Sequence, residues 1–157
     1  MRVNSINDLP ETMRKQAATA LAGGSKVVVP APPEEAKRDK FGSQWVEFMG
    51  IWFQSKWECQ RYQELLQLER VDQIQDLHVQ VPFGLHVRTP SGETVRIASW
   101  TADFQYWREG RMCIEDTKSG PTKRKEAYVL RRNHFEAEYG VRVQEIERHK
   151  PRFGVGI

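Results

Sequence analysis

Apolar and polar residues alternate along the middle of the chain with the period of two that is typical of strands. The longest alternating run has large apolar residues at every second position from Leu77 to Val87. Pro82 lies inside this run, which predicts either an edge strand or a bulge. Turn residues at 89–92 and at Glu109-Gly110 separate it from two further strands, expected over residues 94–106 and 112–118.

Helical spacing brackets these strands on both sides. Ser55 is a good N-cap residue for a helix to about Arg70, whose buried stripe would hold Glu58, Tyr62, Leu65 and Leu66. A second helix is expected from about residue 123 to residue 139, ended by Gly140, and a strand over residues 141–146 follows it. Residues 45–53 predict a short strand or hairpin around Gly50. The predicted order is therefore helix, three strands, helix, strand, and the fold class is α/β or α+β with helices flanking a mixed sheet.

The first 44 residues have a different character. Residues 10–21 predict a short helix, and the following stretch is rich in glycine, proline and charged residues with little apolar content. We interpret residues 1–44 as an N-terminal helix with a Pro-rich linker or arm, and residues 45–157 as the folded domain.

Composition narrows the class of protein. A chain of 157 residues with 39% hydrophobic residues has material for one core, and its net charge of +3 is small. The basic excess lies in the C-terminal third, where residues 117–152 hold ten Lys or Arg against five Asp or Glu. The two cysteines, Cys59 and Cys113, make no disulfide framework, and no apolar run spans a bilayer or resembles a signal peptide. These features predict a cytoplasmic protein without a membrane partner.

The predicted hairpin brings two aspartates together. If Glu109-Gly110 forms a two-residue loop, Arg108 pairs with Arg111, and the constant sum of paired positions then places Asp103 opposite Asp116. Side chains directly opposed in a sheet have Cβ atoms about 4.5 to 5.5 Å apart. Two carboxylates at that separation repel each other unless a cation lies between them, and a divalent cation that prefers oxygen ligands meets the requirement.

Lys118 lies on the same strand face as Asp116, two residues later. For phosphodiester hydrolysis, a magnesium ion at the carboxylates would neutralise phosphate charge and activate water, while the ammonium group would orient that water or stabilise the transition state. Glu58 could complete the site if its helix packs over the strands.

Structural alternatives remain open for each of these residues. Ser55 and Glu58 also have the spacing of a capping box, in which Glu58 only bonds the Ser55 amide. Asp103 could satisfy a turn, and Asp116 with Lys118 could form a solvated strand end. Glu115 alternates to the opposite face from Asp116, and a bulge would exchange their roles.

The ordered motifs resemble those of a phage-borne family in the PD-(D/E)XK nuclease superfamily, which is related to Holliday junction resolvases. The resemblance runs from about residue 46 to residue 146. Its motifs are residues 50–58, Arg61-Tyr62, Glu64-Leu65, Leu77, Gln80, Phe83, residues 102–104 and residues 114–118. It implies a restriction-endonuclease-like core in the order αβββαβ and a metal-dependent endodeoxyribonuclease of the crossover-junction type.

By this resemblance Asp103, Asp116 and Glu58 are metal ligands, and Lys118 is the catalytic lysine. The metal is expected to be Mg²⁺, with Mn²⁺ as a substitute. Two positions depart from the family pattern. Ala102 replaces the proline of the superfamily motif, which only shapes the strand, and Val81 follows Gln80 where proline is expected, which leaves the role of Gln80 open.

Basic residues follow the catalytic strand and predict the path of DNA. Lys123, Arg124, Lys125, Arg131 and Arg132 lie on or beside the second helix, where they could contact phosphates or simply form a solvated helix face. The expected substrate is a four-way junction or other branched DNA, and a resolvase implies a homodimer in the host cytoplasm if the chain is phage-encoded. A nicking or single-strand nuclease of the same fold, or a non-catalytic DNA-binding module, are the alternatives.

Overall fold

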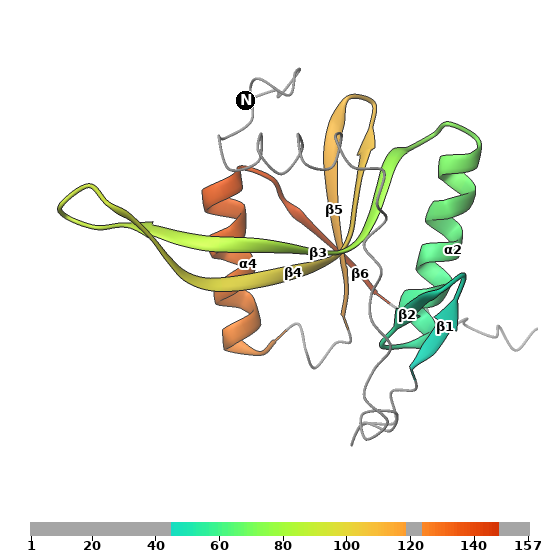
Figure 1. Cartoon of the computed structure of the whole chain (residues 1–157), viewed down its shortest axis with the longest axis horizontal. Coiled ribbons are helices and arrows are strands. Elements are labelled where there is room, and N and C mark those ends of the chain that lie inside the picture. Colours follow the sequence, from blue (N-terminus) through green and yellow to red (C-terminus); the bar gives the residue numbers. More distant parts are fainter. Residues whose placement is uncertain (1–44, 119–123, 148–157) are drawn as a thin grey trace, which may run out of the picture.

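The computed structural model describes residues 45–118 and 124–147 as a mixed α+β fold in which helices flank a mixed sheet (Figure 1). The predicted N-terminal helix and linker, and Lys123 among the predicted DNA-contacting residues, lie outside the described residues. No helix among the described residues is both long enough and apolar enough to cross a membrane.

A small hairpin and a helix begin the described chain. Strands β1 (Val46–Phe48) and β2 (Ile51–Phe53) pair antiparallel through a turn at Met49 and Gly50, which both adopt positive φ as a tight hairpin requires. Helix α2 (Lys56–Arg70) follows with Ser55 as its N-cap residue. The predicted stripe is confirmed, because Glu58, Tyr62, Leu65 and Leu66 are all buried.

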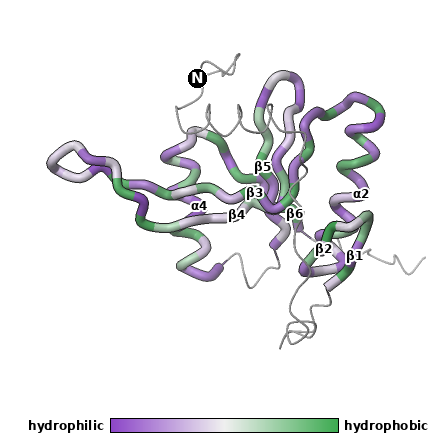
Figure 2. The backbone as a smooth tube through the Cα atoms, in the orientation of Figure 1, coloured by the Kyte–Doolittle hydropathy of each residue, from purple (hydrophilic) through white to green (hydrophobic). Residues whose placement is uncertain are grey.

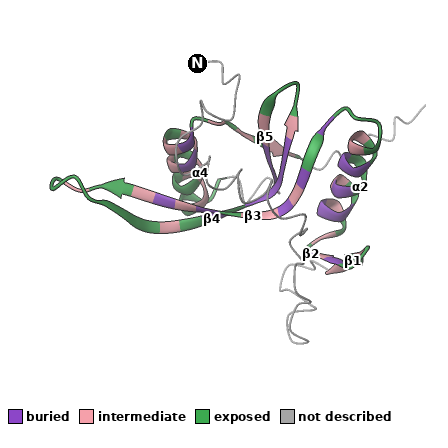
Figure 3. Cartoon of the chain, turned by 45° about the horizontal axis from the view of Figure 1, so that its top comes forward, coloured by how far each residue is buried: buried purple, intermediate pink, exposed green. Residues whose placement is uncertain are grey.

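Two long antiparallel strands form the centre of the molecule. Strand β3 (Gln75–Arg88) pairs with β4 (Thr94–Arg108), and Figure 2 shows apolar and polar residues alternating along this ribbon. Strand β3 is the edge of a sheet in the order β3-β4-β5-β6, as Pro82 predicts. The far end of the ribbon, from Val87 to Ile97, is mostly exposed (Figure 3).

The second half of the chain completes this sheet. Strand β5 (Arg111–Thr117) pairs antiparallel with β4, helix α4 (Glu126–Tyr139) crosses the far half of the ribbon, and β6 (Val143–Ile146) pairs parallel with β5. Helix α4 begins three residues later than the pattern predicts, because Lys125 is in an extended conformation and serves as its N-cap. Gly140 ends the helix in the left-handed conformation, as expected.

The ribbon contributes to two hydrophobic cores, one under each helix. The half next to β5 packs against α2 through Leu77, Val79, Phe104 and Tyr106. The other half packs against α4 through Phe83, Leu85, Trp100 and Ala102. Gln80 and Asp103 lie on the two strands at the point where the ribbon passes from one core to the other. Polar residues therefore come together at this crossing without interrupting either core.

An ion pair between half-buried Arg61 and fully buried Glu115 joins α2 to β5 on the face opposite Asp116. Arg61 donates two hydrogen bonds to Glu115, 2.9 Å from Nε to Oε2 and 2.8 Å from Nη2 to Oε1. The Tyr106 hydroxyl also donates to Glu115 at 2.7 Å, and the Glu115 side chain is fully buried. Glu115 is thus a structural residue held by three donors, as its alternation with Asp116 predicts.

Replacing Glu115 by Gln is expected to lower the free energy of unfolding by about 3 kcal/mol, because it removes the fully buried carboxylate that accepts hydrogen bonds from Arg61 and Tyr106. Urea unfolding of the variant and the parent chain measures this difference. Replacing the exposed Glu93 by Gln provides the control and should change stability by less than about 0.5 kcal/mol. Equal midpoints for all three chains would show that the pair contributes nothing.

Candidate active site

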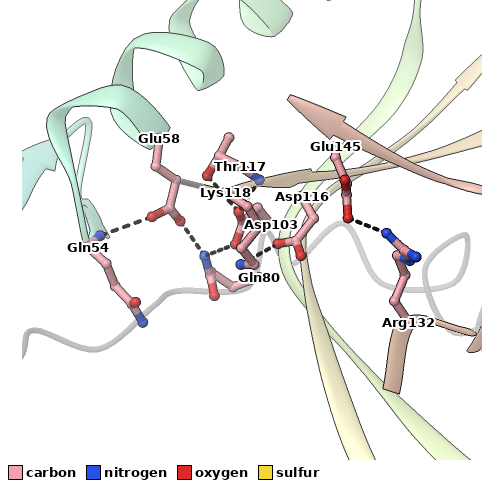
Figure 4. A network of polar contacts seen from close by, with 9 residues as sticks. All are labelled: Gln54, Glu58, Gln80, Asp103, Asp116, Thr117, Lys118, Arg132 and Glu145. Carbon is pink, nitrogen blue, oxygen red and sulfur yellow. Dashed lines mark hydrogen bonds and ion pairs between the residues drawn. The ribbon is translucent and has the colours of Figure 1, made fainter. Parts of the chain in front are cut away.

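A row of polar residues crosses the four-stranded sheet at the point where the ribbon changes core. Gln80 lies between the pairs Val79–Phe104 and Val81–Ala102, which places it across from Asp103 on β4. Asp116 on β5 is in turn the parallel partner of Glu145 on β6. Each strand of the sheet therefore supplies one member of the row, and Figure 4 shows their side chains together.

The hairpin register predicted from the sequence is confirmed as far as it is defined. Arg108 pairs with Arg111 around the positive-φ turn residues Glu109 and Gly110, and the pairing continues to Phe104 and Glu115. Asp103 and Asp116 are the next step of the same register. At this step a side chain takes the place of the backbone hydrogen bonds between the strands. Asp103 Oδ2 accepts from the Thr117 amide and the Thr117 hydroxyl, each at 2.7 Å.

Glu58 has a capping contact, but its carboxylate points toward the row. Its amide donates to Ser55 Oγ at 3.1 Å, which is the first half of a capping box. The carboxylate does not complete the box. One oxygen accepts from the Gln54 amide at 3.2 Å, and the other accepts from the side-chain amide of Gln80. The first turn of α2 thus directs a buried carboxylate at the sheet (Figure 4).

Gln80 connects the helix to the sheet. Its Nε2 donates to Glu58 and lies 3.5 Å from Asp103 Oδ1, so one amide group bridges two carboxylates. The residue has φ of +51° in the middle of a strand, a conformation that non-glycine residues rarely adopt and that generally costs about 1 to 3 kcal/mol. Strain of this kind is concentrated at functional sites, and it supports a role for Gln80 that the sequence left open.

Lys118 follows β5 and forms an ion pair with Asp116, with 2.7 Å between Nζ and Oδ1. Burial alone would lower the pKa of Lys118, but the nearby Asp103 and Asp116 carboxylates outweigh it and raise that pKa. The lysine is therefore a cation at neutral pH. It is the only Lys or Arg among the described residues that forms a salt bridge with Asp116.

Two of the carboxylates are destabilised in their charged form. Burial, and then the charge of Asp103, raise the pKa of Glu58 to about 8 and that of Asp116 to about 7. Both Asp116 oxygens are buried; Oδ1 is in the ion pair with Lys118, and neither oxygen accepts a hydrogen bond of normal geometry from the described residues. A buried carboxylate in this condition gains stability from any added positive charge.

The donor set matches a small divalent cation. Glu58, Asp103 and Asp116 offer only oxygen, the ligand type that Mg²⁺ prefers, and the Asp116 oxygens accept no hydrogen bond of normal geometry from the described residues. These three carboxylates follow one another in a row with the Gln80 amide between the first two. Among the described residues, no three His, Cys, Asp or Glu side chains already surround one point. In this arrangement the carboxylates have the neutral Gln80 amide as a hydrogen-bond donor and the Lys118 ammonium as a positive charge.

The predicted DNA-contacting residues fall into two groups. Arg124, Lys125 and Arg131 are exposed, as a phosphate-binding surface requires. Arg132 is instead engaged within the protein, because its Nη1 lies 2.5 Å from Glu145 Oε1. Its role as a phosphate contact remains a prediction, as does that of Lys123, which is outside the described residues.

Two residues near the site were not assigned a role from the sequence. Tyr128 belongs to the second predicted helix, and the centroid of its ring lies 5.5 Å from Lys118 Nζ. Glu145 was read only as part of the last strand. The sequence held one signal, because Arg132 follows Tyr128 by one helical turn, and a charged residue on a helix face that packs against the protein needs a partner.

Comparison with known proteins identifies a family to which most of the chain matches. No curated protein and no solved structure matches the chain with significant similarity. A family match covers residues 38–150, which include every described element and all the candidate site residues. The chain therefore belongs to the family described as "Protein of unknown function (DUF1064)".

Proposed function

We propose that the chain is a metal-dependent endodeoxyribonuclease with a PD-(D/E)XK core, acting on branched DNA as a Holliday junction resolvase. The observation that carries the proposal is the convergence of Glu58, Asp103, Asp116 and Lys118 from a helix and two strands. Gln80 joins Glu58 to Asp103, Asp103 accepts from Thr117 between the other two residues, and Lys118 pairs with Asp116. The three carboxylates are buried. The element order α2, β3, β4, β5, α4, β6 supports the αβββαβ core of this superfamily.

The chemistry follows from what each side chain offers. Asp103, Asp116 and Glu58 would hold Mg²⁺, or Mn²⁺ in its place, and the bound ion would supply an activated water and neutralise phosphate charge. Lys118 lies beside Asp116 as a permanent cation, where it can orient the attacking water or stabilise charge on the phosphate in the transition state. Gln80 holds Glu58 and Asp103 at a fixed separation.

The surroundings suit a polyanionic substrate. Arg124 and Lys125 precede α4 directly, and Arg131 lies on its exposed surface, so a DNA backbone leaving Lys118 would meet positive charge along this helix. Cutting both strands of a four-way junction symmetrically requires two sites, so we propose that the active form is a homodimer. Its proposed location is the cytoplasm, that of the host if the chain is phage-encoded.

A cleavage assay tests the proposal directly. The purified chain is incubated with an immobile four-way junction and with a linear duplex of matched sequence, each with Mg²⁺ and with chelator. Paired symmetric nicks in the junction alone, dependent on Mg²⁺, are the expected result. Equal cutting of the duplex would replace the resolvase with a nicking or less selective nuclease. Binding without cleavage, in Mg²⁺ and in Mn²⁺, would show a non-catalytic DNA-binding module.

A further inference from the structure

The position of the Lys118 ammonium depends on contacts from two elements. It lies one residue beyond β5, and its side chain is 22% exposed. A lysine side chain has four rotatable bonds and loses considerable conformational freedom when its ammonium is fixed. The ion pair with Asp116 supplies one restraint. A second restraint comes from a different element, helix α4.

Tyr128 covers the Lys118 ammonium from α4. Its ring centroid lies 5.5 Å from Lys118 Nζ, within the range of a cation–π contact. The guanidinium carbon of Arg132, one helical turn later, lies 6.0 Å from the same ring. The aromatic ring thus lies within contact distance of two cations, one from the candidate active site and one from its own helix.

Arg132 is in turn anchored to the sheet. It binds Glu145 of β6, and Glu145 is the parallel partner of Asp116. The contacts therefore form a closed path from Asp116 to Lys118, through Tyr128 and Arg132 to Glu145, and back across the strand pair to Asp116. Because the path closes, movement of the Tyr128 ring would disturb the ion pair at each end.

The Tyr128 hydroxyl is buried beside this path of contacts. The Oη atom is buried, and it forms no hydrogen bond of normal geometry with the described residues. Burial and the Asp116 carboxylate raise the pKa of Tyr128, so the hydroxyl remains a neutral donor beside Asp116. The contacts with the two cations therefore involve the ring and not the hydroxyl, so a substitution that removes only the hydroxyl distinguishes the two groups.

We infer that Tyr128 is a positioning residue for Lys118, whose aromatic ring, held by Arg132 and Glu145, keeps the ammonium group against Asp116. The inference rests on the proposed nuclease function only for its catalytic consequence. The positioning itself is a property of the folded chain, so it can be measured without DNA and without cleavage.

Acylation of Lys118 by an amine-reactive reagent measures this positioning. The full-length chain is labelled briefly, and the modified Lys118 peptide is quantified by mass spectrometry. Tyr128→Leu removes the ring and is expected to increase Lys118 labelling at least about threefold, whereas Tyr128→Phe keeps the ring and should stay within about twofold of the parent. Tyr139→Leu is the matched control, because Tyr139 lies on the same helix but packs in the core under α4 and donates to the Gly84 carbonyl.

Cleavage kinetics give the second readout. Tyr128→Leu is expected to lower kcat by about 10- to 100-fold with little change in KM, because misplacing a catalytic group by about 1 Å can have an effect of that size. Tyr128→Phe should restore most of this activity. If Tyr128→Leu does not fold, Arg132→Met tests the same path with the ring in place, and increased Lys118 labelling is again expected.

The outcomes separate this inference from the proposed function. If no chain cleaves DNA but Tyr128→Leu exposes Lys118 to the reagent, the positioning role stands and the nuclease proposal fails. If the parent cleaves and Tyr128→Leu matches Tyr139→Leu in both labelling and kcat, the positioning role is overturned. Equal loss in the Phe and Leu variants would also overturn it, since it would transfer the effect from the ring to the hydroxyl.

Discussion

Asp116→Asn is expected to abolish DNA cleavage, with a loss of at least about 10³-fold, while junction binding without a divalent cation stays within about threefold. The substitution keeps the shape of the side chain but removes the charge that would hold the cation and that pairs with Lys118. The exposed basic residues of α4 are unchanged, so phosphate binding should persist. Gel assays of cleavage and of binding measure the two quantities separately.

The neighbouring acid provides a matched control. Glu115→Gln changes a carboxylate one position away on the opposite face of β5, so it should cleave at a rate close to the parent when assayed well below its unfolding temperature. Cleavage by Asp116→Asn together with loss of activity in Glu115→Gln would mean that the two acids have the reverse roles. Loss of folding in Asp116→Asn would make Asp116 a structural residue.

A second large effect is expected in the response of thermal stability to pH and to magnesium. The pKa values of Glu58 and Asp116 in the folded chain are about 8 and about 7, against ordinary values of 4.5 and 3.8. Between these limits the folded chain retains protons that the unfolded chain has released. Stability must therefore fall as pH rises through this interval, in the absence of a divalent cation. We expect Tm in chelator to be roughly 5 °C lower at pH 8 than at pH 5.5.

Magnesium should reverse this trend. The ion binds the ionised carboxylates, so the increase in Tm that it produces should be larger at pH 8 than at pH 5.5. The double variant Glu58→Gln with Asp116→Asn should show neither dependence and should be more stable than the parent at pH 8 in chelator. Glu93→Gln, on the exposed ribbon tip, should behave as the parent. A magnesium effect of the same size at both pH values would contradict a site built on these two carboxylates.

The strands and their register could be predicted because short-range rules determine them. Glu109-Gly110 selects a two-residue loop, and that loop alone aligns Asp103 with Asp116. Period-two and helical patterns located the remaining elements within a few residues, since burial of apolar side chains sets both periods. The arrangement of helices against the ribbon followed less directly, because the same alternating set of residues serves two cores.

The site was less predictable where long-range contacts decide a side chain's direction. The Ser55 and Glu58 pattern fits a capping box, and only the packing of α2 near Gln80 shows why the carboxylate turns elsewhere. The positive φ of Gln80 has no local sequence signal, because glycine is the residue that usually marks such a position. The binding of Arg132 to Glu145 likewise depends on the parallel pairing of β5 and β6, which no local pattern specifies.

The adjacent acids Glu115 and Asp116 lie on opposite faces of β5, and the tight turn at Glu109-Gly110 sets which acid lies on which face. A single residue inserted into that turn would slide β5 by one position against β4 and exchange the two faces. Glu115 would then face Glu58 and Asp103, the proposed metal ligands, and Asp116 would face Arg61. A chain that contains every proposed catalytic residue would then lack the proposed site. The alignment of the proposed site residues on β4 and β5 therefore depends on a two-residue loop at the far end of the hairpin, away from the residues that it aligns.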